Sequence, residues 1–409
     1  MALRDAVASM WDDLVQLRHE LHQHPEIGLM LPRTQARVLT ALEGLPLEIS
    51  TGTRTTSVTA VLRGTGEARP ADSPPIVLLR GDMDGLPVTE QADVPYKSQV
   101  EGAMHACGHD LHTTMLVGAA RLLCAHRDLL AGDVVFMFQP GEEGWDGAGV
   151  MIEEGVLEAA GRRADAAYGL HVFSAFAAHG TFLSRPGPMM SASDELHVTV
   201  HGAGGHGSMP DRARDPVPVL AEIVLALQTM VTRRFNIFDP VVLTVGQLHV
   251  GTKANIIPDD GMLEATVRTF SAAAQERMAE ETPRLVEKIA AAHGMRVSVD
   301  YIRQYPVTVN DADETAFAAQ TVTDLFGAAR QVDLQFPVNG SEDFSRVLQN
   351  VPGSFLFLGA GRPDDDPEHA PMNHSPLAIF EDSVMPDGVL LYAELAVRRL
   401  AMLAAGRSR

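Results

Sequence analysis

Short apolar runs, each followed by polar residues, constrain the fold of this chain more than any other feature. Four such runs are bounded by turn residues, at Ile76–Leu79, Val134–Phe138, Tyr168–Val172 and Phe355–Leu358. Stretches with helical spacing lie between them, among them Thr113–Leu130 and Ala148–Ala160. Strands that alternate with helices in this way predict an α/β domain, in which a mostly parallel sheet is covered by helices on both faces.

A different pattern begins near residue 189. Alternation in residues 194–200 is followed by a helical stretch at 216–231, strand-like runs at 241–248 and 262–270, a second helical stretch at 272–293 and a last alternating run at 296–301. This order is βαββαβ, as in ferredoxin-like folds. The sequence therefore predicts a first domain formed by residues 1–188 and 306–409, into which residues 189–305 are inserted as a second domain.

Charge and cysteine content limit the partners and the compartment. The chain has 32 basic and 53 acidic residues, and its net charge of −21 would repel phosphate. We therefore expect no nucleic-acid and no membrane partner. Two cysteines, Cys107 and Cys124, are too few for a disulfide framework. The sequence shows no apolar run of about 18 residues and no signal segment, which favours a cytoplasmic protein.

Side chains that bind metal ions gather where the predicted strands end. The set comprises Asp82, Asp84, Cys107, His109, Glu142, Glu143, His171 and His374. Because ligands on an open α/β sheet bind at the carboxyl ends of its strands, we expect these donors to meet. A solvated sheet edge would not explain why the donors cluster in type. A thiolate, imidazoles and carboxylates suit zinc-like or manganese-like ions, and the set is large enough for two ions.

The adjacent glutamates Glu142 and Glu143 suit such a site because neighbouring side chains diverge. One can bind a metal ion while the other acts as a general base toward water. The residues alone do not decide which glutamate has which role.

Three residues of the inserted domain are candidates for binding a substrate. His206 lies in a glycine-rich turn, Asn255 in Asn-Ile-Ile-Pro and Arg268 in Thr-Val-Arg-Thr-Phe. Taken singly, each is better explained by a structural role. Together, an imidazole, an amide and a guanidinium suit a substrate carboxylate and a developing oxyanion.

Eight motifs in order carry a family likeness. They are Arg80-Gly-Asp-Met-Asp-Gly-Leu-Pro-Val, Met104-His-Ala-Cys-Gly-His-Asp, Phe138-Gln-Pro-Gly-Glu-Glu-Gly, Gly169-Leu-His, Gly205-His-Gly-Ser-Met-Pro, Asn255-Ile-Ile-Pro, Gly340-Ser-Glu-Asp-Phe and Asn373-His-Ser-Pro. From about residue 15 to residue 380, the chain resembles the amidohydrolase branch of the aminoacylase and carboxypeptidase superfamily of dinuclear metallohydrolases. That branch includes hippurate hydrolases and plant indole-acetyl-amino-acid hydrolases.

The resemblance implies a role for each residue that matches the motifs. Glu142 corresponds to the general acid/base, Asp84 to an acid that orients a ligating imidazole, and His206 to a histidine that reaches the neighbouring subunit's site. The inserted domain is implied to act as a lid and to form a homodimer or a higher homo-oligomer. Two divalent ions, manganese or zinc with cobalt or nickel as alternatives, are implied to bind Cys107, His109, Glu143, His171 and His374.

The activity that the resemblance implies is hydrolysis of an N-acyl-L-amino acid to a carboxylate and a free amino acid. Glu142 would move the proton, His206 would stabilise the oxyanion, and Asn255 with Arg268 would hold the α-carboxylate. Two alternatives stay open: a metallo-dipeptidase or carboxypeptidase with the same site, and a noncatalytic metal-dependent binding protein.

Overall fold

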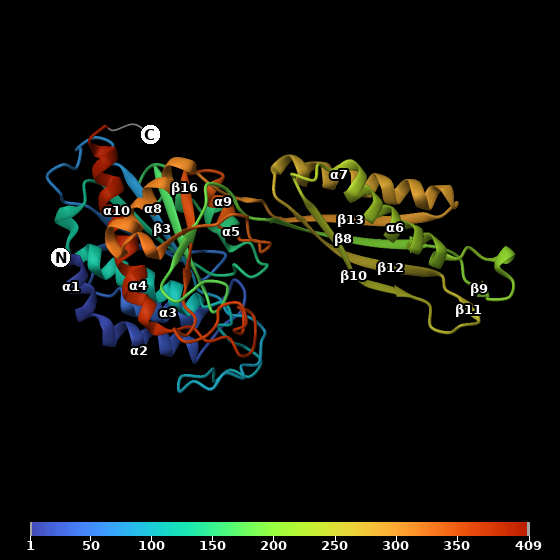
Figure 1. The fold of residues 1–409 in the computed structure, drawn as a ribbon, viewed down its shortest axis with the longest axis horizontal. Coiled ribbons are helices and arrows are strands. Elements are labelled where there is room, and N and C mark those ends of the chain that lie inside the picture. Colours follow the sequence, from blue (N-terminus) through green and yellow to red (C-terminus); the bar gives the residue numbers. More distant parts are fainter. Residues whose placement is uncertain (1, 407–409) are drawn as a thin grey trace. The chain divides into compact units, whose positions relative to one another are not determined.

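The chain forms two compact units in the computed structural model, which describes residues 2–406 (Figure 1). Unit 1 comprises Met1–Met189, Val309–Phe336 and Arg346–Arg409. Unit 2 comprises Met190–Thr308 and Pro337–Ser345. The predicted insertion of residues 189–305 thus corresponds to the larger part of unit 2. The segment Pro337–Ser345, which we had placed in the first domain, belongs by its contacts to unit 2.

Unit 1 is built on an eight-stranded sheet in the order β1-β2-β4-β3-β5-β16-β6-β15. Its neighbours β4, β3, β5 and β16 are parallel, and every residue of these four strands is buried. Both faces of the sheet are therefore covered, as expected for a mostly parallel sheet. The strands are β1 (Leu47–Thr51), β2 (Val58–Arg63), β3 (Ile76–Asp82), β4 (Asp133–Gln139), β5 (Ala166–Phe173), β6 (Phe182–Ser184), β15 (Gln331–Asp333) and β16 (Gly353–Gly359).

The helices of this part of the chain complete an α/β fold, which confirms the predicted class. Helices α4 and α10 pack against each other and against β3 and β5, while α2 packs on α4 and α8 on β16. Apolar side chains of these elements form one continuous core. The helices are α1 (Ala2–Ser9), α2 (Trp11–His22), α3 (Pro32–Ala41), α4 (His109–Ala125), α5 (Gly147–Glu153), α8 (Ala312–Phe326), α9 (Ser345–Leu348) and α10 (Met385–Ala404).

Two helices differ from their predicted bounds. Helix α4 begins at His109 rather than at Thr113, because Gly108 takes the left-handed conformation (φ 80°) directly before it. Helix α5 ends at Glu153 rather than continuing to Ala160, since Gly155 has φ 89° and cannot continue an α-helix. Conformations that favour glycine thus decided both boundaries.

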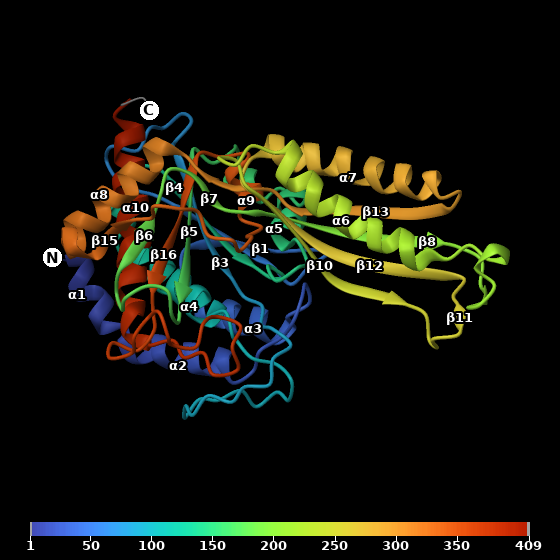
Figure 2. The same ribbon diagram turned by 45° about the vertical axis from the view of Figure 1, so that its right-hand side comes forward.

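Unit 2 has the predicted βαββαβ order. Its four antiparallel strands lie in the order β10-β12-β8-β13, and its two helices pack on one face of this sheet (Figures 1 and 2). The main elements are β8 (Ala192–His201), α6 (Pro216–Arg234), β10 (Val241–Val250), β12 (Asp260–Thr269), α7 (Ala272–Ala292) and β13 (Arg296–Tyr305). Short strands pair as β9 (Gly205–His206) with β11 (Ile256–Ile257) and as β7 (Gly187–Met190) with β14 (Thr308–Asn310).

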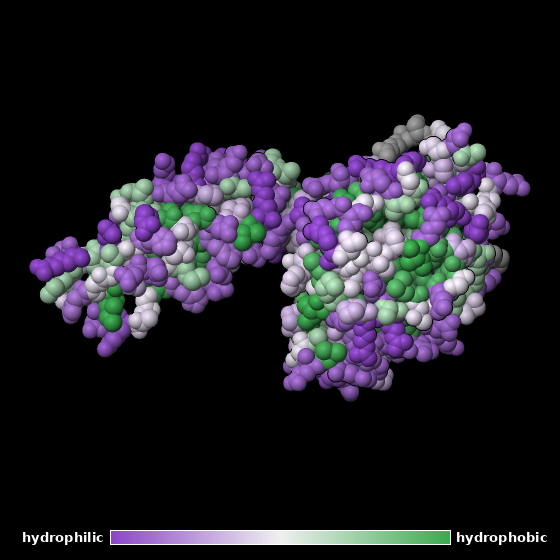
Figure 3. All heavy atoms as spheres, turned by 180° about the vertical axis from the view of Figure 1, so that it is seen from behind, coloured by the Kyte–Doolittle hydropathy of each residue, from purple (hydrophilic) through white to green (hydrophobic). Residues whose placement is uncertain are grey.

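Helix α6 is the one described helix that is long and apolar enough to cross a membrane by length and composition. The sequence analysis predicted a helical stretch at 216–231 but did not identify it as a candidate membrane span. Its side chains Val219, Leu220, Ile223 and Leu227 are buried in the core of unit 2, which is how the core helix of a globular domain passes the same test. Elsewhere the surface is mixed, with apolar side chains exposed in separate small groups (Figure 3).

Candidate functional site

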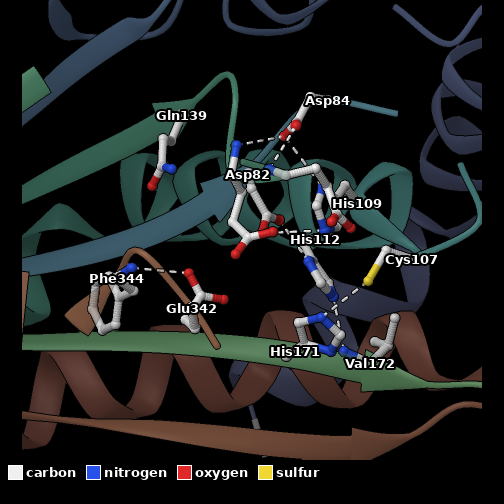
Figure 4. A network of polar contacts seen from close by, with 12 residues as sticks. Asp82, Asp84, Cys107, His109, His112, Gln139, His171, Val172, Glu342 and Phe344 are labelled. Atoms are coloured by element: carbon white, nitrogen blue, oxygen red, sulfur yellow. Dashed lines mark hydrogen bonds and ion pairs between the residues drawn. The ribbon is translucent and has the colours of Figure 1, made fainter. Parts of the chain in front are cut away.

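Separate segments of unit 1 converge at the carboxyl ends of its central strands (Figure 4). Asp82 is the last residue of β3, and Glu142 and Glu143 follow β4. His171 lies on β5, and His374 lies in the loop after β16. Cys107 and His109 come from the turn that leads into α4. The polar clusters therefore meet at the edge of the sheet where the sequence analysis placed them.

Five of these side chains form two groups that share one sulfur atom. Cys107, His109 and His171 each place a donor atom within 4.8 Å of the others, and so do Cys107, Glu143 and His374. The Cys107 Sγ lies 3.3 Å from Nε2 of His171. In the second group, Nε2 of His374 lies 3.1 Å from Oε1 of Glu143. Two donor groups joined by a thiolate fit a pair of divalent ions.

The backbone around these groups adopts conformations that few residues tolerate. Gly108 has φ 80°, and a Cβ atom at this position would lie 2.4 Å from Cγ2 of Val172. Only glycine therefore lets the turn between Cys107 and His109 lie against β5. His374 has φ 71°, a left-handed conformation that costs a non-glycine residue free energy. Its N–H donates to the carbonyl of Ala106 at 2.8 Å, which ties it to the same turn.

Asp84 connects the first group to the loop that carries the glutamates. Its Oδ1 lies 3.3 Å from Nδ1 of His109, and its two oxygens accept from the N–H groups of Glu142 and Glu143 at 3.0 and 3.1 Å. The Nε2 of His109 is buried and has no hydrogen-bond partner within residues 2–406. An imidazole whose Nδ1 is held by a carboxylate and whose Nε2 is left over is typical of a metal ligand.

The electrostatics of these groups favour the binding of cations. Burial opposes a charge on His109, but Asp82 and Asp84 outweigh it and raise the pKa of His109 well above its usual value. Hydrogen bonds to Cys107 and Glu143 raise the pKa of His374 to about 10. Burial, reinforced by His112, lowers the pKa of His171. His109 and His374 therefore bind a proton more readily than a free imidazole, because acidic groups lie beside them. A metal ion at the same place would replace those protons.

Glu142 differs from Glu143 in its partners. Glu143 belongs to a group that contains Cys107, whereas Glu142 belongs to neither group that contains this residue. Burial opposes the charge on Glu143, but His374, His109 and Cys107 together outweigh this effect and lower the pKa of Glu143. The side chain of Glu142 is 6% exposed. Glu143 thus shares a donor group with Cys107, whereas Glu142 shares one with His109 and Glu143 but none with Cys107.

Two further residues belong to the site: Asp82, which the sequence analysis counted among the metal-binding donors without a specific role, and His112, which it did not single out. Asp82 pairs with Arg80 at 2.6 Å and with Nδ1 of His112 at 2.6 Å, and all three side chains are fully buried. Burial opposes the ionised form of Asp82, but Arg80, His109 and His112 together outweigh it and keep the pKa of Asp82 well below its usual value. The spacing of the histidines could have identified His112 from the sequence. His112 follows His109 by three residues, so the two side chains share one face of α4.

In unit 2 the three candidate residues are not brought together. His206 and Asn255 are exposed and lie side by side, since Gly207 N–H donates to the carbonyl of Asn255 at 2.9 Å. Their turn is tied to Asp259, just before β12, whereas Arg268 lies near the other end of β12. At about 3.3 Å per residue, the eight steps along the strand from Asp260 to Arg268 span roughly 26 Å. Arg268 instead donates to Oγ of Ser341 at 3.1 Å.

Comparison with known proteins supplies the family. The model of peptidase family M20/M25/M40 matches residues 78–398. The chain is 35% identical to thermostable carboxypeptidase 2 of Saccharolobus solfataricus, over 97% of this chain and 98% of that protein. It is 36% identical to IAA-amino acid hydrolase ILR1-like 4 of Arabidopsis thaliana, over 97% of this chain and 87% of that protein.

Solved structures agree with this result. A dinuclear metal-binding peptidase of the M20 family from Bacillus subtilis shares 29% identity with a TM-score of 0.79, covering 96% of this chain and 99% of that one. The fold matches that of this peptidase over nearly the whole chain. The chain therefore belongs to peptidase family M20 and is a metal-dependent hydrolase of the amidohydrolase or peptidase type.

Proposed function

We propose that this enzyme hydrolyses the amide bond of N-acyl-L-amino acids. The observation that carries the proposal is the pair of donor groups that share Cys107, with the buried carboxylate of Glu142 beside them. The Arabidopsis relative supports the substrate class, since its name describes a hydrolase of an acylated amino acid. Both cysteines of the chain are unpaired, which agrees with a cytoplasmic enzyme.

We propose Cys107, His109, Glu143, His171 and His374 as the residues that hold two divalent ions, manganese or zinc, with cobalt or nickel as alternatives. Such ions lower the pKa of water and polarise a carbonyl oxygen. Glu142 would accept the proton of the attacking water and deliver it to the leaving nitrogen. Asp84 would keep His109 oriented and hold the backbone of both glutamates in place.

We further propose that the working form is a homodimer. A substrate amino acid is far shorter than the roughly 26 Å that separates the two ends of β12. His206 and Asn255 of one chain therefore cannot act on the same small molecule as Arg268 of that chain. A second chain resolves this difficulty if His206 of the partner subunit stabilises the oxyanion. Arg268 and Asn255 from different chains would then bind the α-carboxylate.

A second candidate is a carboxypeptidase or dipeptidase with the same site. The Saccharolobus relative, which is named a carboxypeptidase, favours it. The two candidates differ in the group on the acyl side of the scissile bond. A dipeptide carries an ammonium group there, whereas an N-acyl amino acid carries none, so the two substrate classes separate the candidates.

The deciding experiment is an assay of purified protein loaded separately with Mn²⁺, Zn²⁺, Co²⁺ or Ni²⁺. The substrates are N-acetyl, N-benzoyl and N-lauroyl amino acids together with unblocked dipeptides, and Glu142→Gln protein serves as the inactive control. We expect hydrolysis of acylated amino acids by at least one metal form. Activity on dipeptides alone would establish the second candidate, and inertness with every metal would indicate a noncatalytic binding protein.

A further inference from the structure

Strands β3 and β5 separate at the candidate site. Their parallel pairing extends only as far as Arg80 and Gly169, although β3 stays paired with β4 up to Asp82 and β5 stays paired with β16 up to Phe173. The stretch of β5 beyond Gly169 carries His171. Along the side of β5 that faces β3, the N–H groups on either side of His171 therefore have no carbonyl acceptor from β3. Because these N–H groups are buried, they need other hydrogen-bond partners.

Two side chains from distant helices supply those partners. Leu170 N–H donates to Oη of Tyr392 at 2.8 Å, and that hydroxyl donates to the carbonyl of Arg80 at 2.6 Å. Val172 N–H donates to Nε2 of His112 at 2.7 Å (Figure 4). The two contacts lie on either side of His171. The backbone of this candidate ligand is thus fixed by side chains in place of a neighbouring strand.

The contact from His112 requires one particular tautomer. Nε2 can accept from Val172 only when the imidazole proton is on Nδ1. Nδ1 lies 2.6 Å from Oδ1 of Asp82, and Oδ2 of Asp82 lies 2.6 Å from Nη1 of Arg80. Because Arg80 is always charged and donates to Asp82, the carboxylate stays an acceptor and holds the proton on Nδ1.

We propose that His112 is a positioning residue that takes the place of the missing strand and fixes His171 for metal binding. Although Asp82, His109 and His112 are close enough to hold an ion, both nitrogens of His112 already have partners, so His112 is not itself a ligand. The inference rests on the proposed metal-dependent function, but its first test needs neither metal nor substrate.

The test compares two amide replacements. In His112→Asn the amide reaches only the position of Nδ1, so the contact with Asp82 is kept and Val172 N–H loses its acceptor. In His112→Gln the amide oxygen reaches the position of Nε2 and can accept from Val172. In metal-free protein, we expect hydrogen exchange of the peptide containing Val172 to rise in the Asn variant and to remain near wild type in the Gln variant.

Cobalt titration is the second readout. Loss of a hydrogen bond that orients a ligand typically lowers metal affinity by about 10-fold to 100-fold. We expect one of the two cobalt sites to weaken by that factor in the Asn variant, while the Gln variant stays within about threefold of wild type.

Thr113→Val is the matched control. Thr113 is the next residue of α4, is fully buried, and donates from Oγ1 to the carbonyl of Asp82 at 2.7 Å. The Val variant removes one buried hydrogen bond between the same helix and β3. We expect it to lower the melting temperature while leaving exchange at Val172 and cobalt affinity unchanged. Equal losses in this variant and in His112→Asn would reduce His112 to a general structural role and overturn the proposal.

Two other results would also overturn it. Equal loss of cobalt in His112→Asn and His112→Gln would make His112 a ligand, and wild-type exchange in both would leave it a packing residue. If the Asn variant does not fold, Asp82→Asn replaces it. In that variant the side-chain amide oxygen at position 82 accepts from Arg80, so the amide NH₂ group points toward Nδ1 of His112. Nδ1 must then accept, and the imidazole proton moves to Nε2. Nε2 can no longer accept the N–H of Val172. Only hydrogen exchange is measured in that variant. Cobalt affinity is not compared, because Asp82 also lies 3.5 Å from Nε2 of the proposed ligand His109 and its substitution can affect metal binding directly.

Discussion

Units 1 and 2 differ in how far they bury their candidate functional side chains, although the side chain of His374 in unit 1 is 54% exposed. In unit 1, Cys107, His109 and His171 are at most 7% exposed and are held by hydrogen bonds that reach across several strands. In unit 2, His206 and Asn255 are exposed and lie far from Arg268 along the sheet.

The difference indicates a division of labour. Buried, oriented donors can stabilise charge without first reorganising, and chemistry requires such donors. His206 and Asn255 lie on the surface of unit 2, at the opposite end of β12 from Arg268. Unit 1 therefore brings its donor groups together within one chain, whereas in the function that we propose the contribution of unit 2 depends on a second chain.

The largest effect is expected from Cys107→Ala. Because its sulfur belongs to both donor groups, the variant should lose both metal ions and all measurable hydrolysis. Metal content after gel filtration is the measurement. Cys124→Ala is the control, since Cys124 is also buried in unit 1 but lies on the apolar part of α4. Retention of both ions without Cys107 would show that unit 1 does not use a shared thiolate.

A smaller loss is expected from Glu142→Gln. The variant keeps the side-chain volume but cannot accept a proton, so turnover should fall by about two to four powers of ten while metal content stays unchanged. Glu143→Gln should instead lose metal, because Glu143 belongs to a group with Cys107. Steady-state kinetics and metal analysis of the pair separate base from ligand. Near-normal turnover of Glu142→Gln would refute this assignment.

His206→Ala tests whether unit 2 acts across subunits. Removal of an oxyanion donor should lower turnover by about 100-fold to 1,000-fold. Mixing this variant with Glu142→Gln, under conditions that allow subunit exchange, should restore about a quarter of wild-type activity, because each mixed dimer contains one intact site. If mixed dimers form but the mixture stays inactive, His206 acts on the site of its own chain. Unit 2 would then not depend on a second chain.

The smallest effect concerns a buried carboxyl group of unit 2. Burial raises the pKa of Asp194, which accepts from Gln275 at 2.8 Å and from Tyr301 at 2.9 Å. A raised pKa in the folded state means that stability from this group is present below about pH 4 and is lost as the pH rises through the folded-state value. The melting temperature of Asp194→Asn, relative to wild type, should therefore rise by no more than about 4 °C between pH 4 and pH 8.

Asp300→Asn serves as the control for this titration. Asp300 lies on β13 and is exposed, so its substitution should shift the melting temperature equally at both pH values. A difference between Asp194→Asn and wild type that does not change with pH would mean that the Asp194 carboxyl group titrates normally in the folded protein.

The central strands were predictable because they are buried on both faces and so appear as continuous apolar runs. β3, β4, β5 and β16 all contain the predicted runs. The edge strands β1 and β15 were not predicted, since they are short and partly exposed. The inner strands β2 and β6 were not predicted either, and β6 has only three residues. The attachment of Pro337–Ser345 to unit 2 was also missed, because it follows from contacts with residues distant in the chain.

The chain alone determined which donors are available and that they follow strands, because residue identity and apolar periodicity are local properties. The tertiary structure decided that Cys107 is common to two donor groups, that His112 receives the N–H of Val172, and that Arg268 lies far from His206. Each of these results depends on the order of strands in a sheet. That order joins residues tens to hundreds of positions apart, and no local pattern records it.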